Sequence, residues 1–363
     1  MVELKKQIKS GQKIIAIYGL GNVGGPIAAA WLRKNATVIG VDISKDLLLN
    51  IKNNSSHKKE PYISETFTKG LRKKKFSLTN NGVKASMLST IKFVAVPVDI
   101  KQNKINLNAL VSATTAISKG LKKGHTVVIC PSLPPGTTEK LVKEILEKHS
   151  KLKVEKDFNL IYNPERIFEG RALQDIEENY PAIVSGYGPK SLKFADELLK
   201  IISKKGTLQM TSLANAEAEK LFEGVYRDVN IALANELSEY CEQIGVNYWD
   251  ARKGANSQPF CHLHYPGTGV GGLCIPVYPK FVIESSKKIG KHVKLIEYSR
   301  KINDQKPKKC VKDALSLFKN NVKGIKVAVL GLGFRGEVTD SRLSPTYTVV
   351  NELLKKQCNV IVH

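Results

Sequence analysis

Residues 13–31 read KIIAIYGLGNVGGPIAAAW, an apolar strand that passes through a glycine-rich turn into a helix. Glycines in such a turn let the backbone approach a pyrophosphate, and the amides at the start of the helix meet its charge. Asp42 lies at the end of the next strand, where its carboxylate would bind a ribose diol and repel a 2′-phosphate. The stretch therefore predicts a site for NAD and not for NADP. The expected cofactor contacts are Gly19, Gly21, Asn22, Val23, Gly24 and Asp42.

The first 210 residues repeat this alternation of strand and helix. Short apolar runs bounded by Gly, Pro or Asp indicate buried strands, and the segments between them have helical periodicity. This order predicts a doubly wound α/β domain of the Rossmann type, with a mainly parallel sheet, over residues 1–210. The expected strands lie within residues 13–19, 37–42, 91–99, 126–132, 158–165 and 181–186.

Residues 213–245 change to one long helical pattern, LANAEAEKLFEGVYRDVNIALANELSEYCEQIG, and Gly245 stands where a C-terminal cap is expected. Apolar residues recur every four positions and predict one stripe. The stripe comprises Leu221, Val225, Val229, Leu233, Leu237 and Cys241. A second set falls on a different face, so we expect the helix to serve a core and a site together. That set comprises Lys220, Gly224, Arg227 and Asn235.

The last part of the chain begins a second α/β pattern, with a strand near 325–331, a helix near 344–357 and a strand near 359–363. Two strands and one helix cannot bury a sheet alone, so we expect 306–363 to be part of a larger domain and 211–305 to be a central helical segment. The turn GLGFRG at 331–336 has two interpretations. It is either a second phosphate-binding loop, with Arg335 and Arg342 as cationic contacts, or a repeated topology without a ligand.

The composition limits the class of protein. A hydrophobic content of 42% is ordinary for a soluble globular chain. The net charge of +24 would suit an anionic partner, but the lysines are spread along the whole chain, so we expect a solvated basic surface and no nucleic-acid partner. No run reaches the roughly 18 apolar residues of a membrane span. We therefore expect no membrane partner. The six cysteines form no CxxC pair, so we expect a cytoplasmic protein with no metal site.

Cys274 lies in an unusual loop, GVGGLCIPVYPKF at residues 269–281. A thiol on a turn of glycines and prolines is sterically open, and a nearby lysine would favour its thiolate form. A loop cysteine can equally be an inert, small apolar filler. The loop by itself leaves both alternatives open.

Six motifs follow one another along nearly the whole chain. They are GLGNVGGPIAAAW (19–31), PSLPPGTTE (131–139), YNPERIFEGRAL (162–173), AEAEKLFEGVYRDVNIALANE (216–236), PGTGVGGLCIP (266–276) and GLGFRGEVTDSRLSP (331–345). Together they resemble the UDP-glucose/GDP-mannose dehydrogenase family, the nucleotide-sugar 6-dehydrogenases. The fourth and fifth motifs are most similar to the branch that oxidises UDP-N-acetylmannosamine or UDP-N-acetylglucosamine.

The resemblance implies an NAD-dependent enzyme that oxidises the C6 alcohol of a UDP-sugar twice through a covalent cysteine adduct. It implies that Cys274 is the nucleophile and that Lys220 stabilises the oxyanion. It further implies that Glu165 takes part in proton transfer and thioester hydrolysis, and that Ser132 holds the water. Pro97 is implied as another cofactor contact, and the long helix as the element that pairs subunits in a homodimer or higher homo-oligomer. The implied substrate contacts are Arg166, Glu169, Arg227, Asn230, Tyr265, Gly271, Gly272, Tyr278, Arg335 and Arg342.

Two positions depart from the family pattern. The family usually has an asparagine where this chain has Gly224, and an aspartate where it has Tyr278. One hypothesis is that Gly224 opens a notch on the helix beside Lys220, and that Tyr278 fills it and offers its phenol group to the site. The leading interpretation is a UDP-N-acetylhexosamine dehydrogenase. The alternatives are a UDP-glucose or GDP-mannose dehydrogenase, and a non-catalytic protein that binds nucleotide sugars.

Overall fold

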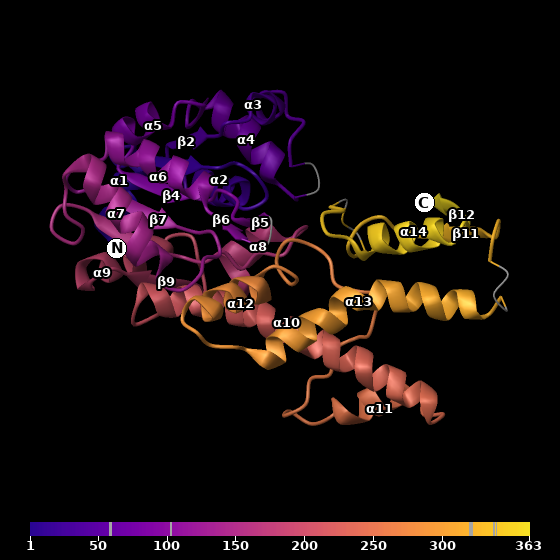
Figure 1. Cartoon of the computed structure of the whole chain (residues 1–363). Helices are drawn as coiled ribbons and strands as arrows, with labels where there is room; N and C mark the ends of the chain where they lie inside the picture. The colour runs from indigo at the N-terminus through magenta and orange to yellow at the C-terminus, as the bar shows by residue number, and fades with distance from the viewer. Residues whose placement is uncertain (58–59, 102–103, 319–321, 337, 339) are drawn as a thin grey trace. The chain divides into compact units, whose positions relative to one another are not determined.

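The computed structural model describes residues 1–57, 60–101, 104–318, 322–336, 338 and 340–363. The chain divides into two compact units, Met1–Lys220 and Leu221–His363. Each unit contains its own sheet and its own helices (Figure 1). The first unit holds the glycine-rich turn, and the second holds Cys274.

An eight-stranded sheet forms the centre of the first unit. Its strands are β1 Ile15–Tyr18, β2 Val38–Val41, β3 Phe76–Thr79, β4 Ile91–Val94, β7 Thr126–Ile129, β8 Asn159–Tyr162, β9 Ala182–Gly186 and β10 Thr207–Gln209. The strand order is β10-β9-β8-β7-β4-β1-β2-β3, and only the β8–β9 pair is antiparallel. From β1 the sheet grows one way through β2 and β3 and the other way through β4, β7 and β8. The predicted doubly wound, mainly parallel fold is therefore confirmed.

Helices cover both faces of this sheet, because side chains alternate between the faces along each strand. The helices are α1 Val2–Ser10, α2 Gly24–Arg33, α3 Lys45–Lys52, α4 Ile63–Arg72, α5 Gly82–Leu88, α6 Asn108–Gly120, α7 Lys143–Ser150, α8 Ala172–Gln174 and α9 Pro189–Leu199, with π-helical turns at Thr138–Val142 and Asp175–Asn179. In β1, Ile15 and Ile17 enter a core shared with α1, α2, α3, α4 and α9. Ala16 and Tyr18 enter the opposite core, shared with α5, α6 and α7.

The sequence patterns miss three pieces of β-structure in this unit. These are β3, β10 and an antiparallel hairpin formed by β5 Asp99–Lys101 and β6 Lys104–Asn106. β3 and β10 are the two outermost strands of the sheet, and most of their residues are partly or fully exposed. Short strands with little buried surface carry no clear apolar run, so periodicity does not find them.

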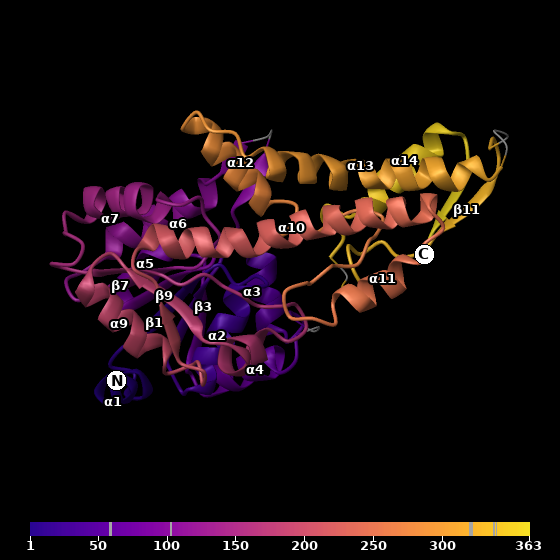
Figure 2. The same cartoon turned by 90° about the horizontal axis from the view of Figure 1, so that it is seen from below.

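The helix α10, Leu213–Gln243, is unbroken, as predicted (Figure 2). Gly245 caps it with a φ of 71°, and the backbone nitrogen of Val246 bonds back to the Cys241 carbonyl oxygen. The burial of its faces differs from the prediction. Leu233, on the predicted apolar stripe, is 42% exposed, whereas Asp228 and Asn235 are fully buried. A four-residue spacing drifts around a helix of 3.6 residues per turn, so the stripe does not stay on one face.

The second unit contains a two-stranded parallel sheet and the remaining helices. Its elements after α10 are α11 Tyr248–Ala255, α12 Tyr278–Lys288, α13 Lys294–Ser316, β11 Lys326–Val329, α14 Pro345–Lys355 and β12 Asn359–Val362. α14 packs with α13 and with the two strands around a small core that contains Val311, Leu315 and Leu353. The predicted order of strand, helix and strand is confirmed. In the described parts of both units, no helix combines the length and the apolar character needed to cross a membrane.

Candidate active site

The glycine-rich turn closely joins the carboxyl ends of β1 and β4. Gly19 has a φ of 88°, and a Cβ atom on it would lie 2.6 Å from the carbonyl oxygen of Ala95, which follows β4. A Cβ atom on Gly24, the first residue of α2, would lie 1.8 Å from the Gly19 carbonyl oxygen. Only glycine fits these two positions. β1 and β4 flank the point where the strand order reverses, which is where doubly wound sheets bind nucleotides.

The open side of this turn can hold a pyrophosphate. A Cβ atom on Gly21 would meet no atom within 4 Å. Asn22 is exposed and Val23 half-buried in the same turn, and α2 begins directly after them. The free amides and the dipole at the start of a helix favour a bound phosphate. The residues present therefore fit NAD, with the pyrophosphate over the turn.

Asp42 follows β2 and supports this turn directly. Its Oδ2 atom accepts a hydrogen bond from the Leu20 nitrogen at 2.8 Å, and its Oδ1 atom accepts one from the Ser44 nitrogen at 2.9 Å. A carboxylate has about four acceptor positions, so Asp42 can bind a ribose diol while it holds the turn. His57 is a contact that the sequence analysis misses, and its Nε2 atom lies 3.3 Å from the Gly21 carbonyl oxygen.

Other predicted residues follow neighbouring strands of the same sheet. Pro97 comes after β4, Ser132 after β7 and Glu165 after β8. These three strands are adjacent and parallel, so their carboxyl ends lie along one edge of the sheet. Arg166 and Glu169 lie on the loop after β8 and are half-buried. The structure thus brings this group to the same sheet edge as the glycine turn.

The loop that carries Ser132 is held at both ends. The Tyr162 hydroxyl group donates a hydrogen bond to the Pro131 carbonyl oxygen at 3.0 Å. At the other end, the Glu217 Oε1 atom accepts hydrogen bonds from the Thr138 nitrogen at 2.8 Å and from the Thr138 hydroxyl group at 2.6 Å. Ser132 lies between these anchors, so its position depends on both of them.

Glu217 is a fully buried carboxylate that the sequence analysis misses. It also accepts a hydrogen bond from the Gly136 nitrogen at 2.5 Å. Burial raises the pKa of Glu217 to about 7, although the hydrogen bonds from Thr138 and Gly136 lower it. Lys220 lies within one turn of Glu217 on α10 and is also buried. The Ser132 loop is therefore tied to the helix that carries Lys220.

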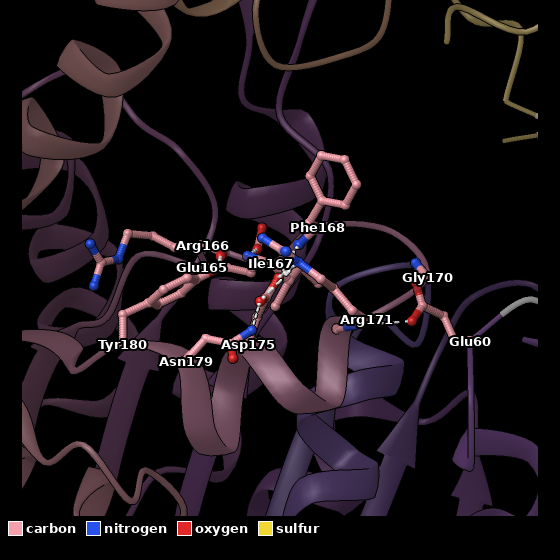
Figure 3. A network of polar contacts seen from close by, with 11 residues as sticks. Glu60, Glu165, Arg166, Ile167, Phe168, Gly170, Arg171, Asp175, Asn179 and Tyr180 are labelled. Atoms are coloured by element: carbon pink, nitrogen blue, oxygen red, sulfur yellow. Dashed lines mark hydrogen bonds and ion pairs between the residues drawn. The ribbon is translucent and has the colours of Figure 1, made fainter. Parts of the chain in front are cut away.

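Figure 3 shows the loop that carries Glu165, and two acidic residues outside it hold its backbone. The Asp175 Oδ2 atom accepts a hydrogen bond from the Phe168 nitrogen at 2.8 Å, and the Glu60 Oε1 atom accepts one from the Gly170 nitrogen at 2.7 Å. Neither acidic residue stands out in the sequence, because its partners are backbone amides, which every segment offers. Glu60 and Asp175 are therefore supports of the site that only the structure identifies.

Glu165 and Arg166 are anchored within the same loop network. The Glu165 Oε1 atom accepts a hydrogen bond from the Ile167 nitrogen. The Arg166 Nη2 atom donates to the Pro181 carbonyl oxygen at 2.6 Å, and its guanidinium carbon lies 4.9 Å from the centre of the Tyr180 ring. These contacts fix the direction of both side chains.

Cys274 is exposed just before α12, and the glycines ahead of it pack against the second glycine motif. A Cβ atom on Gly271 would lie 2.6 Å from the Cβ atom of Phe334, and one on Gly272 would lie 3.0 Å from the Phe334 ring. The Gly272 nitrogen also donates to the Arg342 carbonyl oxygen at 3.0 Å. These glycines leave room for Phe334, and the packing joins the cysteine loop to the segment that contains Arg342.

The second glycine motif follows β11 as the first follows β1, but it does not lead directly into a helix. α14 begins only at Pro345. Residues 337 and 339 of this segment lie outside the described residues. The Arg342 side chain is bonded to the Asp340 carboxylate, with Nη2 to Oδ2 at 2.6 Å, and Arg335 is half-buried. Whether this motif binds a phosphate stays a prediction.

The remaining predicted substrate contacts lie on α10 and in the segment before the cysteine loop. Arg227 is exposed, and the Asn230 amide donates to the Tyr226 carbonyl oxygen of its own helix at 2.9 Å. The Tyr265 ring lies beside the Arg252 guanidinium group, 3.9 Å from the guanidinium carbon to the ring centre. These contacts join Tyr265 to α11 and Asn230 to the preceding turn of α10.

A buried polar network joins α10 to α13 and to the segment before the cysteine loop. Arg300, which is 4% exposed, donates to the Asp228 carboxylate, and Asn303 donates to the same carboxylate at 2.9 Å. Asn235 donates to the Asn303 side-chain oxygen at 3.3 Å and accepts from the Gly267 nitrogen at 2.9 Å. Burial raises the pKa of Asp228, while Arg300 acts in the opposite direction. This network lies on the face of α10 that carries Asn235, which the sequence places away from the apolar stripe.

Tyr278 contacts Gly224, as the notch hypothesis predicts. A Cβ atom on Gly224 would lie 2.5 Å from the Cδ2 atom of Tyr278. The Tyr278 ring therefore occupies the space that a side chain at position 224 would take. A hydrogen bond from its phenol group to a substrate stays a prediction.

The sheet, the glycine turn and Asp42 define an NAD-binding dehydrogenase. More narrowly, the chain belongs to the UDP-glucose/GDP-mannose dehydrogenase family. The family model for the NAD-binding domain matches residues 13–203, and the model for the central domain matches residues 214–305. The predicted family is confirmed, and the protein is an NAD-dependent nucleotide-sugar dehydrogenase.

Named relatives match nearly the whole chain. The UDP-N-acetyl-D-mannosamine dehydrogenase of Methanococcus vannielii is 33% identical over 98% of this chain and 81% of its own length. The enzyme of the same name from Campylobacter jejuni is 34% identical over 96% of this chain and 85% of its own length. The solved structure of UDP-D-ManNAc dehydrogenase from Pyrococcus horikoshii matches with a TM-score of 0.90 at 30% identity, covering 96% of this chain and 82% of that one.

Proposed function

We propose that this protein oxidises the C6 hydroxyl group of a UDP-N-acetylhexosamine to the uronate, with UDP-N-acetyl-D-mannosamine as the expected substrate. The observation that carries the proposal is the match over nearly the full chain to relatives named UDP-N-acetyl-D-mannosamine dehydrogenase. The exposed thiol of Cys274 supports it, because a four-electron oxidation of an alcohol needs a nucleophile for its second half.

The proposed chemistry explains why a thiol is needed. The first oxidation removes a hydride from C6 and a proton from its hydroxyl group, which leaves an aldehyde. The Cys274 thiolate adds to the aldehyde carbon and forms a thiohemiacetal, whose C6 hydrogen leaves as the second hydride. The product is a thioester, which water cleaves to the carboxylate and the free thiol. NAD, when bound, accepts the hydride in each oxidation.

Four side chains are proposed to carry these steps. Cys274 forms the covalent bond to C6, and the Lys220 ammonium group stabilises the negative charge that develops on the C6 oxygen. Glu165 transfers a proton during thioester hydrolysis, and the Ser132 hydroxyl group orients the attacking water. The hydrogen bonds of Glu217 to the Ser132 loop support this arrangement, since they tie the loop to the helix of Lys220.

The proposal also assigns the parts of the chain. Residues 1–210 bind NAD, residues 211–305 carry the pairing helix and the catalytic cysteine, and residues 306–363 contribute to the binding of UDP. Arginines suit the diphosphate, because their fork of donors matches phosphate oxygens. The proposed substrate contacts remain Arg166, Glu169, Arg227, Asn230, Tyr265, Gly271, Gly272, Tyr278, Arg335 and Arg342.

A homodimer in the cytoplasm is the proposed setting. Large apolar side chains on α10 are exposed, among them Phe222 at 60%, Tyr226 at 52% and Tyr240 at 60%. Exposed aromatic side chains along one helix suit pairing with a second copy of the same helix. The oligomer is checked by sedimentation or light scattering, and a monomer at working concentration contradicts this part of the proposal.

The test is NADH formation with a panel of UDP-sugars and GDP-mannose, together with the yield of uronate. We expect two NADH per uronate and the highest kcat/KM with UDP-N-acetyl-D-mannosamine. Cys274→Ser is expected to lower uronate formation by about 1,000-fold or more. Cys261→Ser is the matched control, since Cys261 is half-buried and bonded to Asn256, and it should keep its activity. Unchanged uronate formation by Cys274→Ser would remove this cysteine from the mechanism, and a preference for UDP-glucose or GDP-mannose would support the second substrate class.

A second candidate function is binding of a nucleotide sugar without turnover. The observation that favours it is the pair Gly224 and Tyr278, which replaces two polar side chains usual in the family by glycine and a buried ring. Under this alternative, no nucleotide sugar yields NADH, while a UDP-sugar still raises the melting temperature.

A further inference from the structure

The ring of Tyr278 is seated on the backbone of α10 at Gly224. A Cβ atom on Gly224 would lie 2.5 Å from the Cδ2 atom of Tyr278, 3.1 Å from its Cβ atom and 3.2 Å from its Cγ atom. The last two atoms are fixed close to the backbone of α12, so rotation of the ring alone does not relieve such a contact. A side chain at position 224 therefore has to displace the start of α12.

The ring has little freedom to move elsewhere. Tyr278 is only 7% exposed, and Gly224 is buried beneath it. The fully buried ring of Phe281 lies beside it on α12, with 6.4 Å between the ring centres. Close packing on two sides holds the tyrosine ring in one place.

Backbone hydrogen bonds link the position of Tyr278 to that of Cys274. The Tyr278 and Val277 nitrogens donate to the Cys274 carbonyl oxygen at 2.9 Å and 3.1 Å. On the other side of the cysteine, the Gly272 nitrogen donates to the Arg342 carbonyl oxygen at 3.0 Å. Cys274 thus lies between an anchor at Gly272 and an anchor at Tyr278.

From this geometry we propose that Tyr278 is a positioning residue for the Cys274 thiol, and that Gly224 is required because only glycine leaves room for its ring. This inference rests on the role proposed above for Cys274 as the nucleophile. The pair fixes where the thiolate meets the C6 carbon. A nucleophile misplaced by about 1 Å can lower a rate on the order of 100-fold, so the seating of the ring sets kcat.

A double-mutant cycle tests the pair. Gly224→Ala, Tyr278→Ala and the double variant are compared with the wild type by kcat and KM for NADH formation with UDP-N-acetyl-D-mannosamine. We expect Gly224→Ala to lower kcat by about tenfold or more, with KM within about threefold, when Tyr278 is present. In the Tyr278→Ala background it should lower kcat by less than about twofold, because no ring remains to be displaced. Equal effects of Gly224→Ala in the two backgrounds would overturn the proposal.

Two further variants separate the packing of the ring from other effects. Gly254→Ala on α11 is the matched control, because a Cβ atom there meets no atom within 4 Å, and its kinetics should be unchanged. Tyr278→Phe keeps the ring and should lower kcat by clearly less than Tyr278→Ala does, while the loss of a substrate contact by the hydroxyl group would raise KM. A loss with Tyr278→Phe as large as that with Tyr278→Ala would assign the effect to the hydroxyl group and overturn the proposal. Gly224→Ala can fail to fold. In that case the comparison of Tyr278→Phe with Tyr278→Ala tests the proposal, because neither variant adds atoms to the core.

Alkylation of Cys274 distinguishes a failure of this inference from a failure of the proposed function. The rate at which iodoacetamide modifies Cys274 in the folded chain, followed by peptide mass, requires neither substrate nor NAD. If the wild type forms no NADH, the proposed reaction fails, and the alkylation rate still tests the pair. Gly224→Ala should then change this rate by about threefold or more with Tyr278 present, and by less in the Tyr278→Ala background. The same alkylation rate in the wild type, the two single variants and the double variant would overturn the positioning role.

Discussion

The Oδ2 atom of Asp42 accepts a hydrogen bond of 2.8 Å from the backbone nitrogen of Leu20, so the carboxylate proposed to bind the ribose also supports the glycine turn. This double role makes Asp42 a sharp test of cofactor choice. Asp42→Asn removes the charge that would repel a 2′-phosphate and keeps a single acceptor oxygen for the turn. We expect the ratio of kcat/KM for NADP to kcat/KM for NAD to rise about tenfold or more.

A control lies close by on the first turn of α3. Asp46 is exposed there, and Asp46→Asn removes the same charge without touching the turn. Its cofactor ratio should stay at the wild-type value. An unchanged ratio in Asp42→Asn itself would contradict the placement of the ribose.

The buried carboxylate of Glu217 predicts a pH dependence of stability. Its pKa is raised from 4.5 to about 7 in the folded chain. Between these values the folded chain keeps a proton that the unfolded chain has lost, so the free energy of unfolding falls as pH rises from about 4.5 to about 7 and is level above. Relative to Glu217→Gln, the wild type should lose on the order of 3 kcal/mol across this range, since one pKa unit corresponds to about 1.4 kcal/mol.

The measurement is urea unfolding at several pH values in a Trp249→Phe background, where the buried Trp31 is the remaining tryptophan and reports the first unit. Glu144 is an exposed carboxylate on α7, and the free energy of unfolding of Glu144→Gln should depend on pH in the same way as that of the wild type. If the free energy of unfolding of Glu217→Gln also followed the wild type at every pH, Glu217 would titrate normally in the folded chain.

The ion pair between Asp228 and Arg300 predicts a large loss of stability in the second unit. Both side chains are buried, so Asp228→Ala removes the buried partner of Arg300 and leaves the arginine charge with only the exposed carboxylate of Asp304. We expect the free energy of unfolding to fall by about 3–5 kcal/mol. Urea unfolding in a Trp31→Phe background follows this unit through Trp249.

Glu352→Ala on α14 is the matched control, because its partner Lys355 is exposed. Surface pairs contribute about 0–1 kcal/mol, so this variant should unfold close to the wild type. Similar losses in the two variants would contradict a special role for the buried pair.

The sequence predicts the strand, the glycine turn and the helix of the first motif well, because these depend on local geometry. A tight strand, a turn of glycines and a helix must follow one another in the chain, and Gly19 and Gly24 tolerate no Cβ atom. The position of Asp42 follows from the parallel pairing of β1 and β2. Such features depend on residues that are close together in the chain, so a single sequence is enough to predict them.

The polar supports of the fold are not predictable in the same way. Lys92 lies inside β4 and is fully buried, with its Nζ atom 2.6 Å from the His125 Nδ1 atom, yet the run IKFV gives no sign of this pairing. Glu217 and Asp228 likewise occur in a helical pattern as ordinary charged residues. Their partners come from other elements, so only the tertiary structure shows that these side chains are interior.

The packing of Phe334 against Gly271 and Gly272 also bears on when the cysteine loop becomes ordered during synthesis. On the ribosome this loop is synthesised well before Phe334, and until Phe334 has emerged the glycines lack its cover. Glycine has more backbone freedom to lose than any other residue, so a loop so rich in it gains its order late. The exposed thiol of Cys274 therefore lies in a loop whose packing is completed only after Phe334 has been translated.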